Sequence, residues 1–73
     1  MIVKQAIHTD YIRLQDLLKL TGDANTGGQA KLMIQDGMVL INNQVCLERG
    51  KKIRVGDIVK ILNSNDEIEV VAE

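Results

Sequence analysis

The sequence predicts an α+β fold in which two short helices pack on a small, mainly antiparallel sheet. Apolar residues recur at helical spacing in the first half of the chain, and short apolar runs separated by turn residues fill the second half. Ile, Leu and Val number nine, eight and seven among the 73 residues, which is too many for a disordered segment. We therefore expect one small domain over residues 1–73, which buries about 60% of the surface of its unfolded chain.

The first half opens with a short strand, "IVKQAI", followed by a helix over roughly residues 15–21. The spacing of Leu14, Leu17 and Leu18 marks the buried face of this helix. Gly22 is expected to end it, because glycine readily adopts the left-handed conformation that closes a helix.

The second helix is expected to begin at Thr26. Thr26 and Gln29 form a T-x-x-Q capping box, in which the threonine oxygen accepts from the Gln29 amide and the glutamine side chain reaches back. Lys31 and Gln35 then share an outward face, and Gly37 ends the helix. The inward face consists of Ala30, Met33 and Ile34.

Beyond the second helix the pattern changes to strands. "MVLI" and "VCL" flank "NNQ", where Asn42 and Asn43 suit a tight hairpin turn with left-handed backbone. Gly56 in "RVGD" fits the third position of a type II turn. "DIVKIL" and "EIEVVA" form a final pair around "NSND", with Glu67 and Glu69 on a solvated face of the last strand.

Cysteine usage and hydropathy indicate the compartment. Cys46 is the only cysteine, whereas a secreted domain of this size would rely on several disulfides. The N-terminus lacks the apolar run of a signal peptide, and no segment reaches the length of a membrane span. We expect a soluble, cytoplasmic protein without a membrane partner, with Cys46 as a buried structural thiol.

The net charge of −1 conceals an uneven distribution. Residues 26–60 carry six basic and three acidic groups, residues 1–25 carry three of each, and residues 61–73 carry four acidic groups and no basic one. The middle of the chain is the only net positive part, so the overall charge does not exclude a nucleic-acid partner.

Few residues are suited to catalysis. The chain has one His, one Cys and one Ser, which fall in separate predicted elements: His8, Cys46 and Ser64. His8 lies among polar residues, where a solvated side chain is expected. We therefore expect no catalytic residue, no metal site and no cofactor, because each needs several such groups at matched spacing.

The glycine-rich stretch "GDANTGGQAK" partly matches the motif of a nucleotide-binding loop. Gly22 and Gly27 have the required spacing, but Gly28 and Gln29 replace the lysine and the hydroxyl residue that should follow, so this site is disfavoured. Glycine in a helix costs up to about 1 kcal/mol relative to alanine, so the adjacent glycines need an explanation. Two stay open: a side chain would collide with the sheet or the first helix, or the bare amides leave room for a phosphate.

The segment "ERGKKIR" supplies four basic residues within six positions: Arg49, Lys51, Lys52 and Arg54. Such runs are often merely solvated. This one shares the only net positive part of the chain with the outward Lys31 and the glycine-opened helix start. Three sources of positive potential in one region suit a phosphate backbone.

Residues 26–59, "TGGQAKLMIQDGMVLINNQVCLERGKKIRVGDIV", resemble the S4-type RNA-binding domain. The motifs that carry the resemblance are "TGGQAK", the turn "VLINN", "RGKKIR" and "GDIV". The resemblance covers nearly the whole chain, and the small stand-alone bacterial YbcJ/YaaA-like proteins look most similar. It implies an S4-like (alpha-L) fold and non-enzymatic binding of structured RNA.

By position, the resemblance places RNA contacts at the start of the second helix, in the hairpin turn and in the basic segment. These residues are Thr26, Gly27, Gly28, Gln29, Lys31, Asn42, Arg49, Lys51, Lys52 and Arg54. Arg13 departs from the hydroxyl residue that relatives often carry and is expected to add a phosphate contact. Asn43 replaces the usual turn glycine and Val55 a common proline, which weakens the rigidity of the turns. The matching structural turn residues are Gly50, Gly56 and Asp57.

The composition narrows the kind of RNA. Tyr11 is the only aromatic residue, so the chain lacks the platform on which single-strand readers stack successive bases. Shape and phosphate contacts remain, which favours structured RNA such as ribosomal or transfer RNA, with ribosomal particles as partners and no small-molecule substrate. The leading hypothesis is an RNA-binding module in ribosome assembly or translation. The alternative is a protein-interaction adaptor that uses an exposed sheet edge or the acidic final strand.

Overall fold

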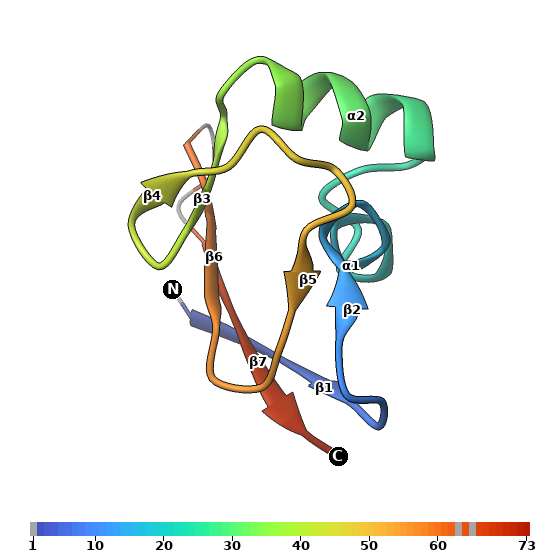
Figure 1. The fold of residues 1–73 in the computed structure, drawn as a ribbon, viewed down its shortest axis with the longest axis vertical. Helices are drawn as coiled ribbons and strands as arrows, with labels where there is room; N and C mark the ends of the chain where they lie inside the picture. The colour runs from blue at the N-terminus through green and yellow to red at the C-terminus, as the bar shows by residue number, and fades with distance from the viewer. Residues whose placement is uncertain (1, 63, 65) are drawn as a thin grey trace.

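The computed structural model describes residues 2–62, 64 and 66–73. Within these residues the chain forms two helices, α1 (Leu14–Leu20) and α2 (Gly27–Gln35), and a set of short strands (Figure 1). The strands are β1 (Ile2–Ile7), β2 (Ile12–Arg13), β3 (Val39–Ile41), β4 (Gln44–Val45), β5 (Lys52–Ile53), β6 (Ile58–Ile61) and β7 (Glu67–Ala72).

Five of the strands form one mixed sheet in the order β1-β7-β6-β3-β4. β1 and β7 are parallel, and the other neighbouring pairs are antiparallel. β2 and β5 form a separate two-stranded antiparallel sheet. The predicted α+β class and the mainly antiparallel pairing are therefore confirmed. The sequence pattern does not indicate β2, because a strand of two residues is too short for alternation to show.

The core lies between the five-stranded sheet and the helices, which Figure 1 shows on the same side of that sheet. Alternation along the strands directs one set of side chains to this core, and the register keeps Val59, Ile68 and their neighbours on the same face. The fully buried residues of the core include Leu14, Leu17, Leu18, Ala30, Ile34, Val39, Ile53, Val59, Ile61, Ile68 and Val70. Met33 is half-buried against it, so the predicted inward face of α2 is confirmed.

Local hydrogen bonds fix both ends of α2. Thr26 Oγ1 accepts from Gln29 N at 3.1 Å, as predicted, while Gln29 Oε1 accepts from Asn25 N at 2.7 Å, one residue further back than a capping box requires. At the other end Gly37 has φ +78° and donates to Ile34 O at 3.1 Å. These bonds place the helix where the sequence predicted it.

The two predicted turns are present. Asn42 and Asn43 have φ 51° and 70°, which fits the left-handed hairpin turn between β3 and β4. Gly56 has φ +97°, and Asp57 N donates to Arg54 O at 3.0 Å across the second turn. The turn predicted at "NSND" includes positions 63 and 65, which lie outside the described residues.

The exposure of three side chains can be compared with what the sequence predicted. Cys46 is half-buried, not buried as predicted, because it follows the short edge strand β4 and packs against the core on one side only. Lys31, predicted on the outward face of α2, is likewise half-buried. His8 is solvated as expected, with 80% of its side chain exposed and Nδ1 at 3.4 Å from Glu73 Oε2.

Candidate nucleic-acid interface

The basic loop, residues 49–54, is docked on the first turn of α1. Leu14 N donates to Lys51 O at 2.9 Å, and Gln15 N donates to Arg49 O at 3.0 Å. The N-cap residue of α1 is Arg13, whose side chain makes no capping hydrogen bond, so these loop carbonyls satisfy amides that the helix leaves free. The docking fixes the loop backbone while the side chains of Arg49 and Lys51 stay exposed.

Cationic side chains gather where β2 meets β5. Arg13 lies opposite Lys52 in the register of this small sheet. Lys52 Nζ lies 4.9 Å and Arg54 Cζ 5.9 Å from the centroid of the Tyr11 ring, within the range of cation–π attraction. The structure thus brings Lys52 and Arg54 together around an aromatic ring, with Arg13 on the strand beside Lys52. Tyr11 was not among the predicted site residues, and the sequence marks it only as the single aromatic residue, two residues before Arg13.

The start of α2 forms a second part of the candidate interface. Thr26 engages the amide of Gln29, while the amides of Gly27 and Gly28 form no hydrogen bond with the residues described. A Cβ added at Gly27 would meet nothing within 4 Å, and one at Gly28 would meet only Thr26 Oγ1 at 3.9 Å. Collision with the sheet or α1 therefore does not explain these glycines, and the space beside their amides is open.

Gly50, in the basic loop, differs from the other turn glycines. Lys51 N donates to Glu48 O at 3.2 Å, so Gly50 lies within a turn as predicted. Its φ is not left-handed, however, and an added Cβ would meet nothing within 4 Å. Gly56, by contrast, adopts φ +97°, which disfavours other residues. The local backbone thus requires glycine at position 56 but not at position 50.

Asn42 braces the hairpin turn against the turn that follows the basic loop. Its Nδ2 donates to Asp57 Oδ1 at 3.1 Å, and its Oδ1 accepts from Ile58 N at 3.0 Å. Asp57 Oδ2 in turn accepts from Arg54 N at 2.8 Å, which confirms Asp57 as a structural turn residue. The amide group of Asn42, predicted to contact RNA, is thus engaged within the protein and holds the backbone beside Arg54.

The acidic end of the chain lies on the sheet face opposite the helices. Glu67 stands opposite Lys60, and Glu69 stands opposite Lys4, in the registers of β6 and β1 with β7. Lys60 therefore contributes to the positive charge of residues 26–60 without joining the interface. This separation lets a chain of net charge −1 present a cationic surface at the loop that docks on α1.

Figure 1 shows the basic loop running below α2 towards the start of α1.

Within the described ranges, no group of three or more His, Cys, Asp or Glu is arranged to hold a metal ion. No helix in that part of the chain is long and apolar enough to cross a membrane.

Comparison with known proteins identifies the family. A sequence model of the S4 domain matches residues 5–71. The probable ribosome maturation protein RlbA of Bacillus subtilis (strain 168) is 39% identical over 56 residues, which cover 77% of this chain and 79% of that protein. The small ribosomal subunit protein uS4 of Oleidesulfovibrio alaskensis is 28% identical over 61 residues, which cover 84% of this chain but 29% of that protein.

One solved structure has a fold similar to that of this chain. Heat shock protein 15 of Vibrio cholerae, a trimeric structure, is similar with a TM-score of 0.66 at 24% identity. The match covers 78% of this chain and 57% of that one, and it supports the S4-like fold. Together with the match over residues 5–71, these findings confirm the resemblance seen in the sequence: the chain belongs to the S4 domain family.

Proposed function

We propose that this chain is a non-enzymatic RNA-binding module, a single S4-type domain over residues 1–73 that recognises structured RNA through phosphate and shape contacts. Membership of the S4 family and similarity to a ribosome maturation protein and a ribosomal protein support RNA binding related to the ribosome. The RNA is ribosomal or transfer RNA, alone or in ribosomal particles. The process is ribosome assembly or translation in the cytoplasm.

The observation that carries this proposal is the open space at three glycines of the candidate interface. Gly27, Gly28 and Gly50 have neither a close neighbour that excludes a side chain nor a left-handed backbone that favours glycine. A side chain would fit at Gly27 and Gly28, so packing does not account for these glycines. Because glycine makes a helix less stable than alanine does, helix propensity does not account for them either. Close approach of an anion to the backbone does, and RNA phosphates are such anions.

Binding follows from the two parts of the interface. At the start of α2, the amides of Gly27 and Gly28 donate to phosphate oxygens. Around the start of α1, exposed cations engage further phosphates of the same RNA: Arg13, Arg49, Lys51, Lys52 and Arg54. Because the loop backbone is fixed by its docking on α1, the spacing of these contacts selects RNA of a particular shape.

The adaptor alternative has less support. The acidic strand β7 is hydrogen-bonded to β1 on one side and β6 on the other, so its backbone is not open to an added strand. The edges of the five-stranded sheet are β1 and the two-residue β4. An adaptor would therefore have to pair with one of these two edges.

Crosslinking in cells followed by sequencing of the bound RNA tests the proposal directly. Ribosomal or transfer RNA should be enriched over messenger RNA of equal abundance. In vitro, five phosphate contacts should give a slope of log affinity against log salt between about −3 and −5. Binding that does not weaken with salt, or recovery of protein without RNA, would contradict the proposal and favour an adaptor.

A further inference from the structure

A pocket of about 600 Å³ lies beside Tyr11, next to the cationic surface. Its lining consists of Thr9, Asp10, Tyr11, Ile12, Arg13 and Asp16. It is an open depression rather than an enclosed cavity, which suits a base that stays attached to its RNA chain. Arg13 is the only predicted RNA-binding residue among them, so the other five lining residues take no part in the proposed phosphate contacts.

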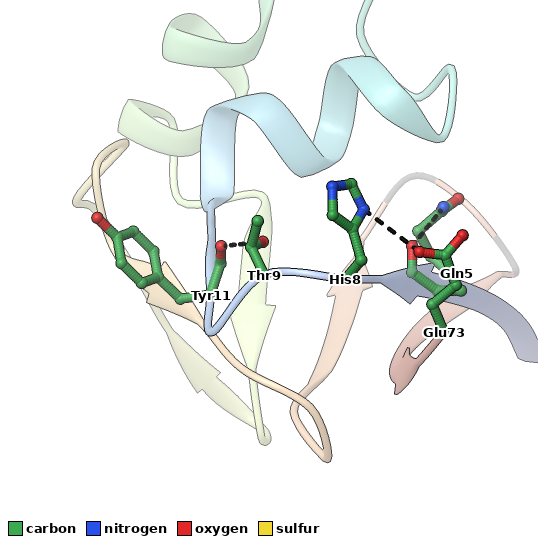
Figure 2. A network of polar contacts seen from close by, with 6 residues as sticks. Gln5, His8, Thr9, Tyr11 and Glu73 are labelled. Atoms are coloured by element: carbon green, nitrogen blue, oxygen red, sulfur yellow. Dashed lines mark hydrogen bonds and ion pairs between the residues drawn. The ribbon is translucent and has the colours of Figure 1, made fainter.

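Local contacts hold the Tyr11 ring at the pocket. Thr9 Oγ1 donates to Tyr11 O at 2.9 Å, and Figure 2 shows this bond fixing the backbone while the ring extends away from it. Lys52 Nζ, 4.9 Å from the ring centroid, links the ring to the basic loop. An aromatic ring beside a phosphate-binding surface is positioned to stack on a base whose own phosphate is bound nearby.

The charges in the pocket suit a base better than a phosphate. Asp10 and Asp16 line the pocket, and carboxylates repel phosphate and accept hydrogen bonds from base amino groups. Asp16 is paired with Lys19 at 3.4 Å across one helical turn, and both side chains are partly exposed. The guanidinium of Arg13 has five N–H donors, so it can engage a phosphate and also donate to a base oxygen or ring nitrogen. Aromatic face, acceptor and donor are the three features that recognise a nucleobase.

We propose that this pocket holds one unpaired nucleobase of the bound RNA, stacked on Tyr11, with guanine preferred over uracil. Guanine offers an amino donor to a carboxylate and the acceptors O6 and N7 to an arginine, whereas uracil has no amino group. The inference rests on the proposed function and narrows its substrate class to duplex RNA interrupted by an unpaired nucleotide. One ring accepts one base, which agrees with the absence of an extended aromatic platform.

The chain contains one Tyr and no Trp, so its intrinsic fluorescence reports on Tyr11 alone. The probes are three RNA duplexes of roughly 16 base pairs, a length that a small double-strand-binding domain spans. One is fully paired, one carries a single unpaired guanosine, and one a single unpaired uridine. We expect the unaltered protein to bind the guanosine bulge about tenfold more tightly than the paired duplex. Tyrosine emission should be quenched by the guanosine bulge and not by the paired duplex at equal absorbance.

Variants separate stacking from a general loss of structure. Tyr11→Leu should abolish the tenfold preference, and Tyr11→Phe should keep it, because phenylalanine retains the aromatic face. Circular dichroism checks that both variants fold. If Tyr11→Leu proves unstable, the emission measurement on the unaltered protein still shows whether a base stacks on Tyr11.

The outcomes distinguish this inference from the function on which it rests. Salt-dependent binding of all three duplexes with equal affinity and unchanged emission would overturn the base pocket and leave the RNA-binding proposal intact. Equal affinity for the guanosine and uridine bulges would overturn the guanine preference. Failure to bind any structured RNA, ribosomal and transfer RNA included, would overturn both.

Discussion

Gly28 separates what the fold requires from what binding requires. Its amide lies in the first turn of α2, it has no left-handed φ, and only Thr26 Oγ1 would contact an added Cβ, at 3.9 Å. Alanine is therefore compatible with the fold. Because alanine gives the unfolded chain less backbone freedom than glycine does, the substitution should stabilise the folded protein. A methyl group at this position would instead occupy the space in which we place a phosphate.

We predict that Gly28→Ala raises the free energy of unfolding by about 0.4–1 kcal/mol and weakens RNA binding. Chemical denaturation and fluorescence anisotropy with labelled RNA measure the two effects separately. Gly22→Ala is the control, because Gly22 has φ +85° and alanine there should destabilise the protein. A stabilised Gly28 variant with unchanged RNA affinity would remove the phosphate from this helix start.

The hydroxyl of Thr26 makes the capping bond of α2, with Oγ1 at 3.1 Å from Gln29 N. Thr26→Ala should lower the free energy of unfolding by about 1 kcal/mol, since the Gln29 amide loses its acceptor. Thr26→Ser, which keeps the oxygen, should recover most of that loss. Urea unfolding of the three proteins tests this, and an unaffected alanine variant would show that the cap contributes nothing.

The sequence predicted this cap because T-x-x-Q is a local signal. It could not predict how far Lys31 or Cys46 would be covered, because that depends on residues distant in the chain. For the same reason the open space at Gly27, Gly28 and Gly50 was not visible in the sequence. Both explanations of the adjacent glycines fitted the pattern until the neighbours in space were known.

Among the secondary-structure elements, the turns that follow β3 and β5 act as one unit. Asn42 connects them through bonds to Asp57 Oδ1 and Ile58 N, and Asp57 accepts from the backbone of Arg54. The position of Arg54 beside Tyr11 therefore depends on a residue in another turn. This explains how Asn42 contributes to the interface although its own amide group is engaged within the protein.

Asn42→Gly tests this brace while preserving the left-handed backbone, which glycine adopts freely. We expect the free energy of unfolding to fall by about 1–3 kcal/mol, because Asp57 and the Ile58 amide both lose a partner. Asn43→Gly is the matched control: it leaves both bonds in place and supplies the glycine favoured at the second turn position. Equal stability of the two variants in chemical denaturation would show that the brace is unimportant.

Elements with a local signal were predicted correctly, whereas the pairing of strands that are distant in the sequence was not predicted. Each helix is followed closely by a glycine with left-handed φ, α2 also has its Thr26 cap, and the β3–β4 hairpin has its two asparagines. The parallel pairing of β1 with β7 joins the two ends of the chain, and no residue near either strand specifies it. The β2–β5 pair, which holds Arg13 beside Lys52, is likewise non-local.

At the scale of the whole molecule, the fold sorts charges that are mixed along the sequence. Lys4 and Lys60 stand opposite carboxylates on the sheet face away from the helices, whereas Lys51 and Lys52 belong to the loop that docks on α1. The sequence located the basic segment through its local density of charge. It could not show that Lys60, within the same positive region, faces Glu67.

This sorting provides a matched pair of variants for the last prediction. Lys51→Gln with Lys52→Gln and Lys4→Gln with Lys60→Gln remove the same net charge from different faces. We expect only the loop variant to lose RNA affinity sharply, and its plot of log affinity against log salt to become shallower by about 1.5, because two phosphate contacts are lost. Each pair should alter stability by no more than about 1 kcal/mol, since all four substitutions are at the surface and remove only weak pairings. Equal losses of affinity in the two variants would mean that RNA responds to net charge alone, and the loop would then have no specific role in binding.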